Sequence, residues 1–170
     1  MNFIGKKNLT RKLLLNAPII LLFISVLNDF DFNYLELKYF SFNFSYILIF
    51  YFSLKKSQSL GYGLIFIAGL FNDVVIGIPM GISSLVYLLL CGAAAYLRNI
   101  TLRPNLMKDW LFFLMTILTI NSIAYLILTF IFDYEIDFFS QLVNILFTFL
   151  FYLAFSYLFT FFDRTLMGKP

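Results

Sequence analysis

One carboxylate in an otherwise uncharged apolar stretch is the residue in this chain best placed to do chemistry. Asp73 is the only charged residue between positions 61 and 97. A charge beside hydrocarbon is costly, so it usually has a partner and often a role. Gly77, Pro79 and Gly81 follow it closely and predict a break between two helices.

The break itself suggests what Asp73 would bind. A carboxylate near the end of one helix opposes the dipole of that helix. The first N–H groups of the next helix have no partner within it, so we predict that the N–H groups between Gly81 and Ser84 donate to Asp73. Gly77 suits the left-handed conformation that ends a helix, and Pro79 suits the first turn of the next. The alternative is a carboxylate that faces water in the outer headgroup layer.

Other catalytic groups are missing from the sequence. The chain has no histidine, and the single Cys91 excludes an internal disulfide and a cysteine metal cluster. No phosphate loop, nucleophile elbow or metal-ligand pair occurs. An intramembrane enzyme would need a pair of carboxylates near hydrocarbon, and only Asp73 lies there. We therefore predict a non-enzymatic protein without cofactor or metal.

Composition predicts a membrane domain. Of 170 residues, 62% are hydrophobic and only 12% are charged, whereas a soluble domain is about a quarter charged. We predict one integral membrane domain, residues 1–170, folded as an all-α compact bundle of about six transmembrane helices. The predicted spans are about 13–27, 39–54, 60–76, 79–97, 110–132 and 138–162. The second is short against the roughly 20 residues that a bilayer requires, so we expect it to be partly interfacial or to lie in thinned bilayer.

The distribution of charge predicts the orientation. With both termini cytoplasmic, every lysine and arginine except Lys38 lies on the cytoplasmic side, as basic residues do in membrane proteins. Their position beside the span ends indicates topology and lipid contact, not nucleic-acid binding. A secretory signal peptide has the same basic and apolar halves as residues 1–27, but no small-residue cleavage site follows, so we expect a retained first span.

Small and polar residues within the spans have a structural explanation. Small residues predict close packing of two helices, with a docking face for another membrane protein as the alternative; they are Gly61, Gly63, Ala68 and Gly69 in the third span and Gly92, Ala93, Ala94 and Ala95 in the fourth. Polar residues within spans predict hydrogen bonds between helices, and they are Asn16, Asn121, Ser122, Gln141 and Asn144. The polar residues are too scattered in sequence to predict a common site.

The stretch from residue 50 to residue 98 resembles the rod shape-determining protein MreD family. The shared pattern is a helix that ends in G-x-x-x-D, a G-x-P-x-G break and a helix with an apolar-Tyr run, carried here by Gly69 and Asp73, by Gly77, Pro79 and Gly81, and by Leu85 to Leu89. The size, the six predicted spans and the short second span are also similar. Residues 36–43 lack the proline that this family usually has there, which affects the outer loop and not the topology.

The resemblance implies a function. It implies a non-enzymatic scaffold in the bacterial inner (cytoplasmic) membrane that binds MreC and, through it, MreB, RodA and a class B penicillin-binding protein. Lateral peptidoglycan synthesis and rod shape would depend on this elongation machinery. It also makes Gly69, Asp73, Gly77, Pro79 and Gly81 candidates for structural or partner contacts.

A second class of protein fits the same length and helix number. The substrate-binding membrane subunit of an energy-coupling-factor vitamin transporter is also a compact six-helix protein, and the MreD resemblance extends to its fold. It would need a cavity with convergent polar groups near the outer face, for which Asn72, Asp73, Ser83 and Ser84, together with the acidic loop residues, are candidates. The Ala-x-x-x-Ala coupling motif expected in its first span is absent, since only Ala17 is present there.

Overall fold

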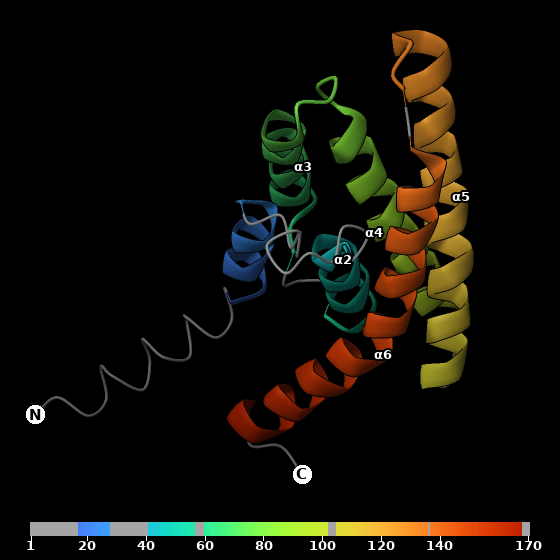
Figure 1. Ribbon diagram of the computed structural model, residues 1–170. Helices are drawn as coiled ribbons and strands as arrows, with labels where there is room; N and C mark the ends of the chain where they lie inside the picture. Colours follow the sequence, from blue (N-terminus) through green and yellow to red (C-terminus); the bar gives the residue numbers. More distant parts are fainter. Residues whose placement is uncertain (1–16, 28–40, 57–59, 102–104, 136, 168–170) are drawn as a thin grey trace, which may run out of the picture.

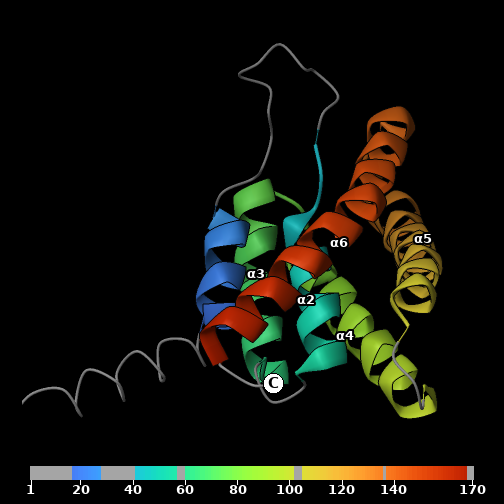
Figure 2. The same ribbon diagram turned by 90° about the horizontal axis from the view of Figure 1, so that it is seen from below.

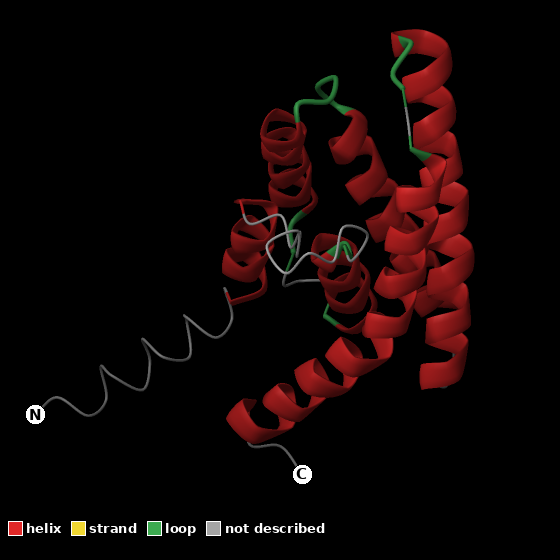
Figure 3. Ribbon diagram, viewed as in Figure 1, coloured by secondary structure: helices red, strands yellow, loops and turns green. Residues whose placement is uncertain are grey.

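The computed structural model describes residues 17–27, 41–56, 60–101, 105–135 and 137–167. The regular elements of these residues are helices, coloured red in Figure 3. They are a first helix over Ala17–Leu27, then α2 (Phe44–Lys55), α3 (Tyr62–Ile76), α4 (Ile82–Ile100), α5 (Leu106–Phe132) and α6 (Phe138–Met167). Each predicted span overlaps one of these helices, which confirms the all-α prediction for the described residues.

Three of the helices are long and apolar enough to cross a membrane. They are α4, α5 and the part of α6 from Phe138 to Phe162. The 27 residues of α5 extend about 40 Å at 1.5 Å per residue, against about 30 Å of hydrocarbon. Many large apolar side chains on the outer faces of α3, α5 and α6 are exposed, as lipid contact requires. The chain therefore has the build of a helical membrane protein.

The short helix α2 forms the centre of the bundle. Its 12 residues extend only about 18 Å, and Ser45 and every residue from Ile47 to Leu54 are buried. Figures 1 and 2 show α2 among the other helices, with α4 beside it and α6 passing across it. Protein covers this helix, while the expectation that the segment is partly interfacial or lies in thinned bilayer stays a prediction. A helix that is apolar on every side is typical of a core element.

Helix α6 bends and closes one side of the bundle. Its first half runs beside α5, and its second half turns away beneath α2 (Figures 1 and 2). The indole N–H of Trp110 donates to the carbonyl oxygen of Phe149 at 2.9 Å, and the Thr148 hydroxyl donates to the Asn144 carbonyl at 2.7 Å. Side chains that bond to carbonyl groups inside a helix are a known cause of bending.

The charged residues divide between the two ends of the bundle. The connections after α3 and after α5 lie at the same end (Figure 1), where Glu135 and Asp137 border one cavity with Asn72. Lys55 and Asp109 pair at the opposite end. This agrees with the alternating spans inferred from the sequence, while the end that faces the cytoplasm stays a prediction.

The small residues of α3 and α4 contribute unequally to packing. Gly69 and Ala94 are buried, as predicted. A Cβ atom added to Gly61, Gly63 or Gly92 would meet nothing within 4 Å, so the packing prediction was wrong for these three. The two helices approach most closely near their shared turn, and the outer glycines lie beyond that contact.

Candidate functional site

Asp73 is held by the backbone of the following helix. Its side chain is fully buried. The N–H of Gly81 donates to Asp73 Oδ2 at 2.6 Å, and the N–H of Ser83 donates to Oδ1 at 2.8 Å. This confirms the prediction drawn from the sequence and excludes the carboxylate that faces water. Charge-assisted bonds to backbone amides are among the stronger hydrogen bonds in proteins.

Two glycines shape the turn between α3 and α4. Gly77 has φ +77° and donates its N–H to the Asp73 carbonyl at 2.9 Å, as the prediction for a helix end required. Gly81 has φ +104° and precedes α4 as its N-cap. Pro79 was predicted in the first turn of the helix and instead lies in the turn before it. The positive φ of Gly81 is not helical, so the helix can begin only at Ile82.

A second contact joins α3 to α4 above the turn. The Ser84 hydroxyl donates to the Phe66 carbonyl at 3.0 Å. A Cβ atom added to Gly69 would lie 2.4 Å from the Cα atom of Ser84, far inside any normal contact. The backbone of α4 therefore occupies the space that a side chain at Gly69 would need. Asp73, Gly69 and Ser84 together fix the two helices as one hairpin.

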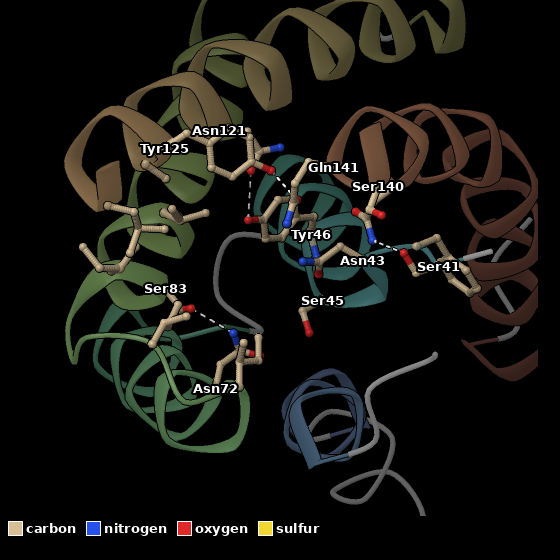
Figure 4. A pocket seen from close by; sticks show the side chains of 18 of the residues that line it. Ser41, Asn43, Ser45, Tyr46, Asn72, Ser83, Asn121, Tyr125, Ser140 and Gln141 are labelled. Atoms are coloured by element: carbon tan, nitrogen blue, oxygen red, sulfur yellow. Dashed lines mark hydrogen bonds between the residues drawn. The ribbon is translucent and has the colours of Figure 1, made fainter. Parts of the chain in front are cut away.

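A polar cavity lies beside this hairpin, with a volume of about 440 Å³ (Figure 4). Its lining comes from the first helix, from α2 and the segment before it, and from all four later helices. The polar side chains around it are those of Ser25, Ser41, Asn43, Ser45, Tyr46, Asn72, Ser83, Asn121, Tyr125, Ser140, Gln141 and Asn144. Such convergence of polar groups from distant segments is typical of ligand sites.

Two asparagines at the cavity use only one end of their amide within the protein. Asn72 donates from Nδ2 to the Ser83 hydroxyl at 2.8 Å, and Asn121 accepts at Oδ1 from the Tyr46 hydroxyl at 3.2 Å. Figure 4 shows these pairs on opposite sides of the cavity. Within the described part of the chain, Asn72 Oδ1 and Asn121 Nδ2 have no protein partner. An acceptor and a donor are thus available to water or to a ligand.

Tyr125 and Gln141 form the wall between α5 and α6. The Tyr125 hydroxyl donates to Gln141 Oε1, which leaves the amide nitrogen of Gln141 without a partner among the described residues. Behind this wall is a second, apolar groove of about 470 Å³, lined mainly by large side chains of α5 and α6 such as Leu118, Leu126 and Leu142. Tyr125 and Gln141 border both spaces.

The charge around the polar cavity is negative. Its lining includes Glu135 and Asp137 and no lysine or arginine among the described residues. The Asp137 carboxylate accepts from the Ser140 hydroxyl at 2.6 Å and from the Phe139 N–H at 3.1 Å. The bond from Ser140 is the main cause that lowers the pKa of Asp137 below its ordinary value. An ionised rim of this kind disfavours anionic ligands.

The sequence located part of this site and missed the rest. Asn72 and Ser83 line the cavity, as the substrate-binding alternative predicted, whereas Asp73 and Ser84 are used inside the hairpin. Helix spacing in α5 and α6 could have suggested the remaining groups. Polar residues three or four apart share one helix face, and the pairs concerned are Asn121 with Tyr125 and Gln141 with Asn144.

Residues predicted to be scattered therefore meet in space. Asn121, Gln141 and Asn144 all border the cavity, so the structure forms a common site that their spacing in the sequence did not predict. Ser122 borders only the apolar groove, and its hydroxyl donates to the Leu118 carbonyl at 2.8 Å. Asn16 lies outside the described residues.

A second buried carboxylate lies at the other end of the bundle. Asp109 is buried in the first turn of α5, and Lys55 Nζ lies 3.1 Å from its Oδ2. Nearby, Arg98 donates to the Ser53 carbonyl at 3.0 Å. The sequence analysis did not single out Asp109, because it stands beside basic residues near a predicted span end. Within the described residues, no group of three or more His, Cys, Asp or Glu side chains could hold a metal ion.

The fold and the site together define a helical membrane protein with a polar cavity at one end. Comparison with protein-family models, with curated proteins and with solved structures finds no match for this chain. The resemblance to the MreD family rests on the residues between positions 50 and 98 and on the size and predicted spans of the chain, and it stays a prediction.

Proposed function

We propose that this protein is a non-enzymatic scaffold of the bacterial cell-elongation machinery. It would sit in the inner membrane as a multi-pass protein and bind MreC. Through MreC it would support MreB, RodA and a class B penicillin-binding protein in lateral peptidoglycan synthesis. The observation that carries the proposal is the α3–α4 hairpin, in which residues of the family pattern hold the two helices together.

Each of these residues has a physical task in the hairpin. Gly69 permits the close approach to Ser84, Asp73 receives two N–H groups of the α4 start, and Gly77 and Gly81 adopt positive φ. Together, these residues of the family pattern would keep the two helices as a rigid pair. Rigid elements lose little conformational entropy when a partner binds.

The hairpin also offers a face for a partner helix. Phe66, Phe71, Val74 and Val75 on α3 are large, apolar and exposed. Helices associate in lipid through van der Waals packing of complementary surfaces. A single membrane helix of MreC laid against this face would contact a surface that is already formed.

The test is purification from the native membrane followed by identification of the proteins that accompany the chain. We expect MreC together with wall-synthesis proteins. Changing Val74 and Val75 to alanine should reduce the recovery of MreC without changing the melting temperature, because both side chains are exposed. Met115→Ala, on the exposed face of α5, is the matched control and should leave recovery unchanged.

The substrate-binding subunit of a vitamin transporter is the second candidate, and the polar cavity favours it. In that case the chain would be recovered with transporter ATPases and not with MreC. Its melting temperature would rise with one member of a vitamin panel. Recovery of MreC together with no vitamin-dependent shift would exclude this candidate.

A further inference from the structure

The polar cavity and the apolar groove share one wall. Asn121, Tyr125 and Gln141 border both spaces. On one side of this wall lie amides and hydroxyls, and on the other lie apolar side chains of α5 and α6 that belong to predicted membrane spans. A polar space of about 440 Å³ therefore adjoins an apolar one of about 470 Å³.

The polar side sets the chemistry of a bound headgroup. The available groups are amide donors and acceptors, such as Asn121 Nδ2 and Asn72 Oδ1, with no cation in the described lining. The acidic side chains Glu135 and Asp137 repel a phosphate or a carboxylate. Amides of this kind match hydroxyl groups, each of which can donate and accept. The cavity thus fits an uncharged headgroup that carries several hydroxyls.

The apolar side sets what is attached to that headgroup. The groove is lined by Leu118, Leu126, Phe130 and Leu142, and only a few polar atoms border it. A hydrocarbon chain in it would exchange lipid contacts for protein contacts at little cost. A ligand with both parts would be held by its headgroup and oriented by its chain.

We propose that the cavity and the groove bind one amphiphile together: a lipid with a neutral, hydroxyl-bearing headgroup in the cavity and an acyl chain between α5 and α6. This inference does not rest on the scaffold function, because it depends on a site on the other side of the bundle from the exposed face of α3. It selects lipids by headgroup charge, which a general annular contact does not do.

The test is native mass spectrometry of the full chain in mild detergent. The probes are monoglucosyl diacylglycerol and phosphatidylglycerol with the same acyl chains, offered in equal amounts. We expect one retained glycolipid, favoured over phosphatidylglycerol by about tenfold or more, since the acidic rim repels the phosphate. Methyl glucoside, the headgroup without chains, should bind far more weakly, as measured by its effect on the melting temperature.

Three variants locate the two parts of the site. Asn121→Leu should weaken glycolipid retention by roughly five- to tenfold through the loss of one hydrogen-bonding group. Leu126→Trp, on the exposed side of α5, should fill the groove and block the lipid without touching the cavity. Asn99→Leu, on the exposed end of α4, is the control for replacement of an amide and should change nothing.

Several results would overturn the proposal. Equal retention of both lipids would remove the headgroup selection. Unchanged retention of the glycolipid by the Leu126→Trp variant would show that the groove is not part of the site. A rise in melting temperature with methyl glucoside as large as that with the glycolipid would show the same. If Asn121→Leu lowers the melting temperature of the lipid-free protein, its loss of lipid retention no longer tests the cavity. Lipid retention by the Leu126→Trp variant and the competition between the two lipids then decide whether the proposal holds.

Discussion

Among the described residues, two buried carboxylates are stabilised in different ways. Asp73 lies between α3 and α4, where two backbone N–H groups donate to it and no lysine or arginine of the described part of the chain takes part. Asp109 lies at the opposite end of the bundle and pairs with Lys55, whose side chain is 33% exposed. The first carboxylate is bound by fixed dipoles, and the second by a flexible side chain that reaches water.

The difference determines what each carboxylate can tolerate. Backbone N–H groups cannot move to water when Asp73 is removed. The loss of their acceptor therefore lowers the stability of the folded protein by its full amount. Lys55 is partly exposed and can turn toward solvent when Asp109 is removed, so the loss of this pair costs little. The Asp73 end should therefore determine the geometry of the helices, and the Asp109 end should only adjust their stability.

The largest effect is expected at Asp73. Asp73→Leu leaves the N–H groups of Gly81 and Ser83 without an acceptor, at about 1 to 3 kcal/mol each, so we expect a loss of about 2 to 6 kcal/mol. Asp73→Asn should lose less, because its carbonyl oxygen can still accept one bond. The measurement is denaturant unfolding of the purified protein in detergent. Native folded yield and stability in both variants would show that the contacts of Asp73 are dispensable.

The next effect concerns the close approach of the two helices at the same end. Gly69→Ala places a Cβ atom against the backbone of Ser84, and overpacking of this kind costs about 1 to 3 kcal/mol. Gly63→Ala is the matched control on the same helix, because its Cβ atom would meet nothing within 4 Å. It should be neutral or stabilising by up to about 1 kcal/mol. Equal melting temperatures for the two variants would contradict the tight packing at Gly69.

A smaller effect is expected at the other end. Asp109→Asn removes the ion pair with Lys55, and we expect a loss of about 1 kcal/mol at low ionic strength. The loss should shrink in about 1 M salt, which screens exposed charges, whereas the loss at Asp73 should not depend on salt. Unfolding curves of the Asp109 and Asp73 variants at two salt concentrations measure both losses of stability. A salt-dependent loss at Asp73 would make the two ends equivalent.

The smallest effect is a dependence on pH at the start of α6. The pKa of Asp137 is lowered in the folded protein, chiefly by the hydrogen bond from Ser140. A lowered pKa contributes stability above the unfolded value of about 4, and that stability is lost as the pH falls through the folded pKa. The free energy of unfolding of the unaltered protein should therefore exceed that of Asp137→Asn by its full amount at pH 6. This difference should decline below about pH 4. A difference in the free energy of unfolding that stays constant from pH 6 to pH 3 would show that this carboxylate does not cap the helix.

Local chemistry was readable from the chain. The bond from Ser83 to Asp73 spans 10 residues, and the glycines between them leave few paths for the backbone. Free amides at a helix start attract a carboxylate nearby in sequence, so the hairpin could be anticipated. The position of Pro79 could not be anticipated, because it depended on Gly81 taking a positive φ as well as Gly77.

Long-range contacts were not readable. Asp109 is 54 residues from Lys55, and the Tyr46 hydroxyl reaches Asn121 across 75 residues. Neither pair has a sequence pattern that links its members. The cavity follows from such contacts, so its polar residues were interpreted as scattered bonds between helices.

The sequence by itself determined that the chain is helical and lipid-exposed, where each apolar segment lies, and how Asp73 closes the turn after α3. Only the tertiary structure decided that α2 is enclosed by protein while the equally apolar α6 lies partly open, and that polar groups of six helices meet in one cavity. The physical reason is the solvent. Lipid and protein interior are both apolar, so hydrophobic periodicity does not mark the inner face of a helix as it does in water.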